Sequence, residues 1–370
     1  MLFHICKLNK VKYSTFFNFS VISRLTKIQE YLILHQKKAI LYENNNCTGF
    51  FLTMEQWLIG FDIGGTKCAA ILGKVEDGKF FIVQKSVFPT KEFPAPIDCI
   101  EKFSTEITKI LAAFPEVHPT AIGISCGGPL DSKKGIIMSP PNLPGWDDVH
   151  ICEILENKFH LPVKLCNDAD ACALAEWKFG AGKGAENMAF LTFGTGLGAG
   201  LILNGKLYSG SCGMAGECGH IRLDDSGPTG YGKSGSFEGF CSGGGIAQLG
   251  RIYAEKNLPL SWCRSVDDLK NITAKSVADA ANAGDPVAIA VYAESGRRLG
   301  YGLSILIDLL NLEKIVIGSV FARSENLLRP AMEEVIAQEA LPQSRAICKI
   351  LPAELGENIG DIAALSVAML

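Results

Sequence analysis

Two stretches of the chain repeat one pattern, in which an apolar strand enters a glycine-rich turn and leaves it as a second strand. The first stretch is FDIGGTKCAA, beginning at Phe61, and the second is LTFGTGLGAG, beginning at Leu191. Two such openings indicate a duplicated unit rather than one enlarged sheet. The repeat lies in the pattern and not in residue identity.

The elements that follow each opening support this division. Strands are expected at WLIGFDIG, CAAILGKV, KFFIVQKSVF, TAIGIS and VKLC in the first half, and at MAFLTFG, GAGLILNGKLY and KIVIGS in the second. Helices are expected at Ile97–Phe114, Val149–Phe159 and Asp170–Phe179, from Pro286 to about Leu310 behind an Asp285 cap, and twice after KIVIGS. This order predicts α/β domains with mixed sheets flanked by helices.

Charge is distributed unevenly along the 370 residues. Residues 1–53 have seven Lys or Arg and two Glu, so they carry +5, and the net charge of −4 leaves −9 for residues 54–370. A body this acidic is a poor general nucleic-acid binder, and no nucleic-acid partner is expected. The hydrophobic fraction of 48% excludes global disorder.

The thirteen cysteines are scattered, contain no CxxC pair and lie mostly in apolar stretches. This usage predicts reduced core thiols in a cytoplasmic protein rather than a disulfide framework. Residues 1–53 contain neither an apolar run long enough to span a bilayer nor the pattern of a signal peptide. Arg24–Ile40 could form one amphipathic helix. Three interpretations of this segment stay open: an extension upstream of a start at Met54, a partner-binding arm, and a truncated DNA-reading module.

Two glycine motifs resemble nucleotide-binding signatures but stand in the wrong context. GTGLGA, from Gly194, fits a dinucleotide fingerprint, yet a strand and not a helix is expected after it. GPTGYGKS, from Gly227, fits the P-loop string, but the glycine-rich sequence after Ser234 is a poor start for a helix. Both motifs are therefore interpreted as something else.

The turn DIGGTK, Asp62 to Lys67, fits a third kind of phosphate-binding site. A tight turn between antiparallel strands presents backbone N–H groups and a hydroxyl to phosphate oxygens. An aspartate at the strand end is suited to hold Mg²⁺ through water. The turn Gly194-Thr195-Gly196 offers the same chemistry without a carboxylate, so two such turns could hold a nucleotide between them.

Three segments together carry a family resemblance: DIGGTK, CNDADACALAEWKFGAGKG and FGTGLGAGLILNGKLYSGSCGMAGECGH. From about Leu58 to the C-terminus the chain resembles the ROK family of sugar kinases and related repressors, and within it glucokinases and N-acetylmannosamine kinases. The resemblance implies an actin/hexokinase-type fold, with two RNase H-like domains around a central cleft. It places the domains at residues 54–180, completed by the C-terminal helix, and 181–370.

The resemblance also implies ATP and Mg²⁺ as cofactors and transfer of the γ-phosphate to the 6-hydroxyl of a hexose or N-acetylhexosamine. Asp168 is expected to be the catalytic base, at the mouth of an alanine-rich helix whose dipole favours a carboxylate. The sugar is expected to contact Asn167, Asp168, Glu217, His220, Glu238, Gly128 and Asn142. The nucleotide and its phosphates are expected at Asp62, Gly64, Gly65, Thr66, Lys67, Gly194, Thr195, Gly196, Gly318 and Ser319, with Mg²⁺ held by Asp62 through water.

The chain departs from the family at its zinc motif, C-x-C-G-x-x-G-C-x-E. Aligned on Glu238, Thr229, Tyr231 and Ser236 stand where three cysteines are expected. Ser and Thr are not normal structural zinc ligands, and Tyr is a rare one, so no zinc site is expected. His220 would then be free to bind the sugar.

Three functions compete at this stage: a sugar kinase, a sugar-responsive repressor, and a P-loop switch that would depend on Lys233. Only 53 residues precede Met54, fewer than a winged-helix module usually needs, and Asp168 is retained, so the kinase is favoured. A homodimer without membrane association is expected, and the sugar stays open. If residues 1–53 are an extension, their deletion leaves activity intact.

Overall fold

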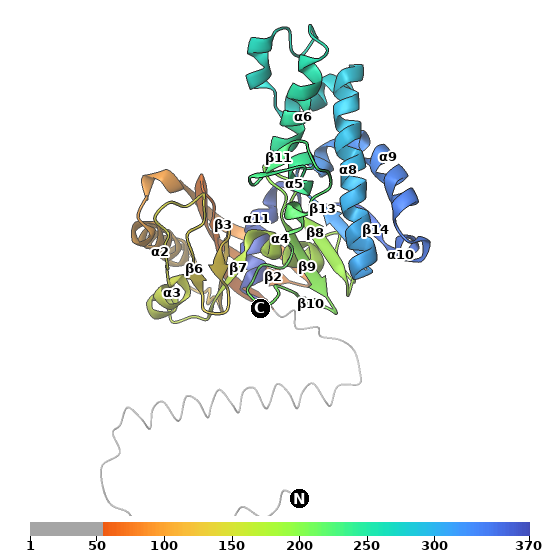
Figure 1. Cartoon of the computed structure of the whole chain (residues 1–370). Coiled ribbons are helices and arrows are strands. Elements are labelled where there is room, and N and C mark those ends of the chain that lie inside the picture. Colours follow the sequence, from red (N-terminus) through yellow and green to blue (C-terminus); the bar gives the residue numbers. More distant parts are fainter. Residues whose placement is uncertain (1–54) are drawn as a thin grey trace, which may run out of the picture. The chain divides into compact units, whose positions relative to one another are not determined.

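The computed structural model describes residues 55–370 (Figure 1). The interpretations of residues 1–53, including the helix Arg24–Ile40, lie outside the described residues. Within the described part, two five-stranded mixed sheets form the framework and helices cover them.

The first sheet has the strand order β3-β2-β1-β4-β7. It contains β1 (Gln56–Ile63), β2 (Lys67–Glu76), β3 (Lys79–Pro89), β4 (Ile122–Cys126) and β7 (Val163–Asn167). The first three strands form an antiparallel meander, and β4 and β7 run parallel to β1. As a result, β1, β4 and β7 all end at the same edge.

The second sheet repeats this arrangement in the order β10-β9-β8-β13-β14. Its strands are β8 (Met188–Leu191), β9 (Ala199–Leu203), β10 (Lys206–Leu207), β13 (Lys314–Ile317) and β14 (Lys349–Pro352). Here too the first three strands are antiparallel neighbours and the last two run parallel to the first. The predicted duplication of an α/β unit is therefore confirmed.

Helices cover the first sheet on both faces. α2 (Pro96–Ala113) and α3 (Ile151–Phe159) pack on one face around Phe61, Phe103 and Leu155. The C-terminal helix α11 (Ile359–Val367) packs on β1 and β4 of the other face, beside α4 (Asp168–Phe179). Small residues permit this approach, since a β-carbon on Gly123 would lie 2.1 Å from the Ala364 carbonyl oxygen. The C-terminus thus covers the sheet that begins the described chain, although the predicted domain boundaries stay a prediction.

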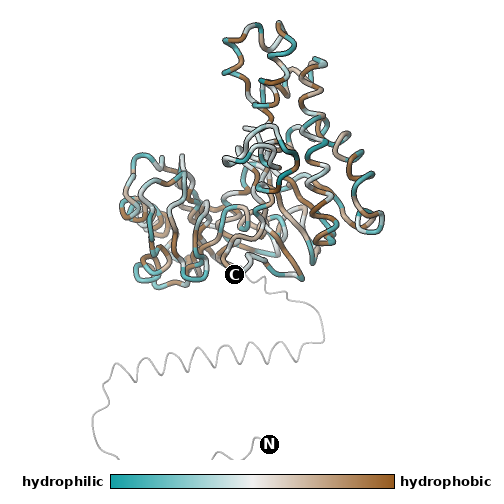
Figure 2. Tube along the Cα trace, in the orientation of Figure 1, coloured by the Kyte–Doolittle hydropathy of each residue, from teal (hydrophilic) through white to brown (hydrophobic). Residues whose placement is uncertain are grey.

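One face of the second sheet is covered by α8 (Pro286–Leu310) and α9 (Val320–Glu339), which pack against each other (Figure 1). On the other face, α4 packs on β8 and β9. α8 begins as predicted, because Asp285 Oδ1 accepts the N–H groups of Val287 and Ala288 at 3.0 and 2.9 Å. Hydrophobic segments follow the strands and the inner sides of the helices (Figure 2).

The remaining elements are short or connect these layers. They are β5 (Leu130–Asp131), β6 (Ile136–Ile137), β11 (Thr229–Gly230), β12 (Lys233–Ser234), α5 (Phe237–Phe240), α6 (Gly243–Glu255), α7 (Ala274–Asn282) and α10 (Pro342–Ile347). Four 3-10 helices add Thr90–Glu92, Cys218–His220, Val266–Asn271 and Gly356–Asn358. The strand β14 was missed from the sequence, since KILP is too short to show a period.

Two further expectations concern the whole described body. Its eleven described cysteines are free thiols, and most are buried, as the apolar stretches around them predicted. No helix among residues 55–370 is both long enough and apolar enough to cross a membrane.

Candidate functional site

The edge where β1, β4 and β7 end brings the predicted catalytic residues together. Asp62 of β1 pairs in register with Ser125, and Cys126 pairs with Asn167. At the ends of these three strands, or directly after them in the chain, lie Asp62, the Gly127-Gly128 pair and Asn167-Asp168. Because these strands are parallel neighbours, residues distant in sequence meet at one end of the sheet.

Asn167 and Asp168 share one backbone donor at the start of α4. The Ala169 N–H donates to Asn167 Oδ1 at 3.0 Å and to Asp168 Oδ1 at 2.8 Å. Among residues 55–370, neither Asp168 Oδ2 nor the Asn167 amide nitrogen has a hydrogen-bond partner from another residue. A β-carbon on Gly128 would lie 3.3 Å from Asn167 Nδ2, so the missing side chain keeps that amide accessible.

Asp168 is exposed, yet surrounding protein removes enough water to raise the pKa of its carboxyl. The N–H groups of Ala169 and of Asp168 itself act in the opposite direction and lower it. The helix N-terminus likewise favours the ionised form. This carboxylate therefore combines solvent access with raised basicity, which are the two properties a general base needs.

The first glycine turn is held from outside by Thr90, at the end of β3. The Gly64 N–H donates to the Lys67 carbonyl at 3.1 Å, and the Thr90 hydroxyl donates to the Gly64 carbonyl at 2.6 Å. The loop that contains Asn142 packs onto the turn, since a β-carbon on Gly65 would lie 2.8 Å from Asn142 Cβ and from its carbonyl oxygen. Thr66 and Lys67 are exposed on this turn.

Asp62 lies in a cluster of carboxyl groups. Its pKa is raised to about 6 by burial and then by the charges of Asp361 and Asp168, while Lys85 and Lys67 oppose the rise. Asp361, on α11, is buried and forms an ion pair with Lys85 at 2.7 Å. The two lysines therefore compensate the negative charge around Asp62 only in part.

The second glycine turn is built by backbone contacts. The Gly194 N–H donates to the Gly196 carbonyl at 2.9 Å, and the Gly243 N–H, at the start of α6, donates to the Gly194 carbonyl at 2.7 Å. Ser319 lies beside this turn, since its hydroxyl would be 3.8 Å from a β-carbon on Gly194. Its neighbour Gly318 donates its N–H to the Leu191 carbonyl at 2.9 Å. The predicted nucleotide residues of the second half therefore lie together.

Glu238 contacts the second turn, because its Oε2 accepts the Leu197 N–H at 3.0 Å. Burial raises the pKa of Glu217, the His220 imidazole lowers it, and the charges of Asp168 and Glu238 raise it further. Glu217 therefore lies within electrostatic reach of both the base and the second turn. His220 is exposed and stacks edge-on against Tyr231, with ring centroids 5.4 Å apart.

The donor set around Asp62 fits a hydrated magnesium ion. Hard carboxylate oxygens with excess negative charge are the surroundings that Mg²⁺ prefers, and Asp62 would hold it through water.

The zinc positions do not fit a zinc ion. Ser236 caps α5 by accepting the Gly239 N–H at 3.1 Å, and the Thr229 backbone is paired with the Gln248 amide. Among residues 55–370, no three His, Cys, Asp or Glu side chains lie together so that they could coordinate a metal ion directly, so a magnesium ion at Asp62 would keep most of its water ligands.

The structure also shows what the two rejected nucleotide motifs form. The P-loop string forms the β11–β12 hairpin, and Lys233 Nζ donates to the His220 carbonyl at 2.6 Å. The dinucleotide fingerprint runs into strand β9. The expectation that the glycine-rich sequence after Ser234 is a poor start for a helix is wrong, because Ser236 caps α5 and α6 begins at Gly243. The P-loop interpretation still fails, because the string itself forms a hairpin rather than a loop between a strand and a helix.

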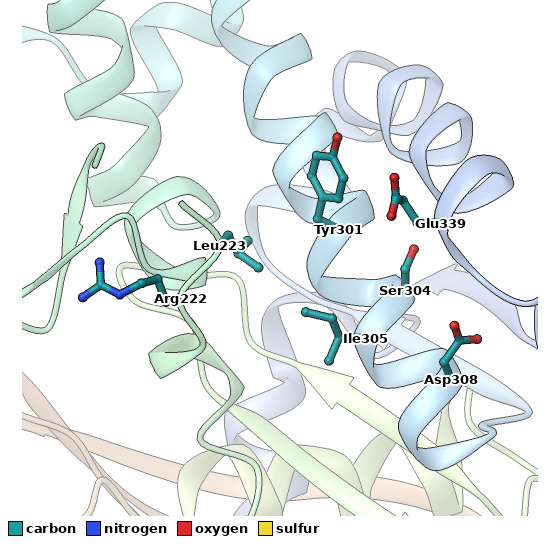
Figure 3. Close-up of a pocket in the computed structure, with 7 residues that line it drawn as sticks. All are labelled: Arg222, Leu223, Tyr301, Ser304, Ile305, Asp308 and Glu339. Carbon is teal, nitrogen blue, oxygen red and sulfur yellow. The ribbon is translucent and has the colours of Figure 1, made fainter. Parts of the chain in front are cut away.

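Two of the cavities differ in whether predicted site residues line them. One, of about 350 Å³, adjoins the first turn. Its lining includes Gly65, Thr90, Lys91, Phe93, Asn142 and Trp146. The other, of about 290 Å³, lies between Arg222 and the exposed side of α8 (Figure 3). It contains none of the predicted site residues.

The predicted site residues thus form two groups. Asp62, the first turn, Gly128, Asn142, Asn167 and Asp168 belong to the first sheet edge. Gly194 to Gly196, Gly318, Ser319 and Glu238 belong to the second, and Glu217 links them through its charge interactions. No hydrogen bond within residues 55–370 joins the two turns directly. Sequence reasoning missed Thr90, Lys85 and Asp361, which support the site from elements without a recognisable motif.

Comparisons with known proteins agree with this geometry. The model of the ROK family matches residues 58–369. A glucokinase of Halalkalibacterium halodurans is 33% identical over 314 residues, covering 83% of this chain and 93% of that protein. A ROK family glucokinase from Streptomyces griseus, solved in complex with glucose and AMPPNP, superposes with a TM-score of 0.65 at 30% identity, covering 85% of this chain and 99% of that one.

Repressors are also among the relatives. A xylose repressor of Bacillus spizizenii is 26% identical over 317 residues, covering 84% of this chain and 76% of that protein. Kinases and repressors thus share the body described above, which has the actin/hexokinase-type fold. The family match over nearly all described residues, together with these relatives, shows that the chain belongs to the ROK family.

Proposed function

We propose that the protein is an ATP-dependent sugar kinase that transfers the γ-phosphate of ATP to the 6-hydroxyl of a hexose or an N-acetylhexosamine. One observation carries the proposal: within the described part of the chain, one carboxylate oxygen of Asp168 at a helix N-terminus accepts no hydrogen bond from another residue, and it lies near Asp62 and the unpaired Asn167 amide nitrogen. Phosphoryl transfer to a hydroxyl needs such a base close to charged groups that can organise phosphates.

In this proposal Asp168 Oδ2 accepts the proton of the sugar hydroxyl as the hydroxyl oxygen attacks the γ-phosphorus, and the bond between the γ-phosphorus and the bridging β-phosphate oxygen breaks to release ADP. Asp168 Oδ1 stays bound to the Ala169 N–H, so the carboxyl group keeps its orientation during the transfer. Asn167 Nδ2 donates to a neighbouring sugar hydroxyl, because Asn167 Oδ1 is already engaged.

The remaining sugar hydroxyls bind Glu217, His220 and Glu238, with Gly128 and Asn142 on the other side. Carboxylate and imidazole groups suit a polyol, since several hydrogen bonds fix the orientation of its ring. Glu238 uses one oxygen for the Leu197 N–H, so it can link the sugar to the second turn.

The nucleotide lies along the two glycine turns. Gly64, Gly65, Thr66 and Lys67 contact the transferred phosphate, and Gly194, Thr195, Gly196, Gly318 and Ser319 contact the rest of ATP. Backbone N–H groups in such turns bind anionic oxygens. Asp62 would hold Mg²⁺ through water, and the ion would neutralise phosphate charge when bound.

The test is an assay for ADP release with a panel of hexoses and N-acetylhexosamines, each measured with ATP and Mg²⁺. We expect one sugar to raise ADP release well above the rate without sugar, and its product to carry phosphate on the 6-hydroxyl. ADP release that no sugar stimulates would contradict the proposal. The apparent mass in solution checks the predicted homodimer.

A sugar-responsive repressor is the second candidate, because a xylose repressor shares this body. Repressor activity predicts salt-sensitive DNA binding that a sugar releases. The full chain should be measured for retention of genomic DNA fragments with and without the panel of sugars. Retention that a sugar abolishes, without any ADP release, would favour the repressor.

A further inference from the structure

Asp170 is a buried carboxyl group that the proposed mechanism does not use. It lies on α4, two residues after Asp168, and is only 4% exposed. Its Oδ2 accepts the Ser209 hydroxyl at 3.0 Å. Its Oδ1 is fully buried and has no hydrogen-bond partner among the described residues.

This geometry disfavours a charge on Asp170. An ionised carboxylate has two oxygens that need donors, and burying it with one neutral donor is costly. The neutral acid costs less, and burial accordingly raises the pKa of Asp170 to about 7. The Ser209 hydroxyl lowers this pKa, and the charges of Asp168 and Glu217 raise it.

The groups that face Asp170 come from several elements, and none is a cation. Asp168 precedes it on α4, Glu217 approaches from the loop before the Cys218–His220 turn, and the Cys166 thiol lies on β7. The strands β8 and β9, which also pack on α4, have no titratable side chain. On α11, Asp361 is paired with Lys85 beside Asp62.

Ser209 stands at the start of the segment that ends at Glu217. The Ala215 N–H donates to the Ser209 carbonyl at 3.2 Å, which closes this segment into a compact loop. The hydrogen bond between Ser209 and Asp170 therefore joins the helix that holds Asp168 to the loop that holds Glu217. In the chain, α4 follows β7 of the first sheet and the loop follows β10 of the second.

We propose that Asp170 is a proton-carrying positioning residue, which holds the Ser209–Glu217 loop against α4 and keeps a third negative charge away from Asp168 and Glu217. The inference rests on the proposed kinase function. When Asp170 loses its proton, three carboxylates face one another with only the His220 imidazole, beside Glu217, to oppose their charge, and both the loop and the anionic transition state are destabilised. Catalysis then declines as the pH rises through neutrality.

The test is the pH dependence of kcat/KM for the sugar in the wild type and in Asp170→Asn. Asparagine keeps the acceptor for Ser209 and cannot ionise. We expect the wild type to lose about tenfold in kcat/KM between about pH 6 and about pH 9, and the variant to lose far less. Equal pH profiles, or a loss of activity by one factor at every pH, would overturn the proposal.

Ser209→Ala examines the hydrogen bond itself. The variant should raise the KM for the sugar several-fold with a smaller change in kcat, because Glu217 loses its fixed position while Asp168 does not. A fall in kcat alone, with an unchanged KM, contradicts a positioning role for this contact.

A measurement without substrate separates this inference from the kinase proposal. Since the folded pKa of Asp170 lies above the unfolded value, the wild type loses stability as the pH rises from about 4 to about 7. The melting temperature of Asp170→Asn should therefore rise relative to the wild type over that range. Asp267→Asn, at an exposed position, is the matched control and should show no such trend. A difference between Asp170→Asn and the wild type that is independent of pH would show that Asp170 holds no extra proton.

Discussion

The two glycine turns have the same place in two sheets of the same strand order, yet they are stabilised differently. The first turn follows Asp62 and lies beside Asp168, with the ion pair of Asp361 and Lys85 behind it. The second turn has no carboxylate of its own. It is held by the N–H groups that begin α6.

Under the proposed function, this difference gives the two turns different roles. Carboxylates near the first turn can accept a proton and attract a hydrated cation, whereas the second turn offers hydrogen bonds to a ligand. A duplicated fold can thus place charge-dependent chemistry in one copy and ligand binding in the other. The comparison predicts that substitutions in the first half change turnover and that those in the second change affinity.

The largest effect is expected at Asp168. Asp168→Asn keeps the size of the side chain and removes the proton acceptor, so kcat should fall by about 10²–10⁴. The KM for ATP should change little, because the second turn is untouched. Steady-state ADP release gives both constants, and sugar binding by calorimetry shows that the site is still folded. A kcat within a few-fold of the wild type would remove Asp168 as the base.

The sequence predicted most of this framework because its signals are local. The two strands joined by a turn in FDIGGTKCAA, the Asp285 cap and the succession of strands along the chain each depend on residues close together in the sequence. The sequence also predicted which residues lie around each of the two turns. This was possible because the family resemblance supplied motifs that sequence spacing alone leaves ambiguous.

The supporting residues could not be predicted in the same way. Lys85 and Asp361 are separated by 276 positions, and their pairing appears only when α11 returns to the first sheet. Thr90 is an ordinary threonine until its hydroxyl reaches the Gly64 carbonyl. In the sequence, Asp170 is one more polar residue in an alanine-rich helix. Its hydrogen bond comes from a loop that is distant in the chain.

The second effect concerns stability and pH. The pKa of Asp62 is about 6 in the folded protein, above its unfolded value, so folding holds a proton there. The wild type therefore loses stability as the pH rises from about 4 to about 6. Asp62→Asn should remove this loss, which amounts to about 3 kcal/mol of unfolding free energy above that range. Urea unfolding at about pH 4 and about pH 8, without Mg²⁺, measures it.

The second turn supplies the control for that experiment. Thr195→Ala changes no titrating group, so its effect on the free energy of unfolding should be equal at both pH values. If the two variants showed the same pH dependence, the electrostatic difference between the turns would be wrong.

The smallest effect is a matched pair of glycine substitutions. In Gly65→Ala the new β-carbon meets the Asn142 backbone at 2.8 Å, which can move only with its loop, so kcat/KM for the sugar should fall about tenfold. In Gly196→Ala it meets Glu238 Oε2 at 2.8 Å, the end of a flexible side chain, so the loss should be about threefold and appear mainly in the KM for ATP. Equal losses in the same constant would mean that both turns bind the same part of the ligands, and the division between chemistry and binding would fail.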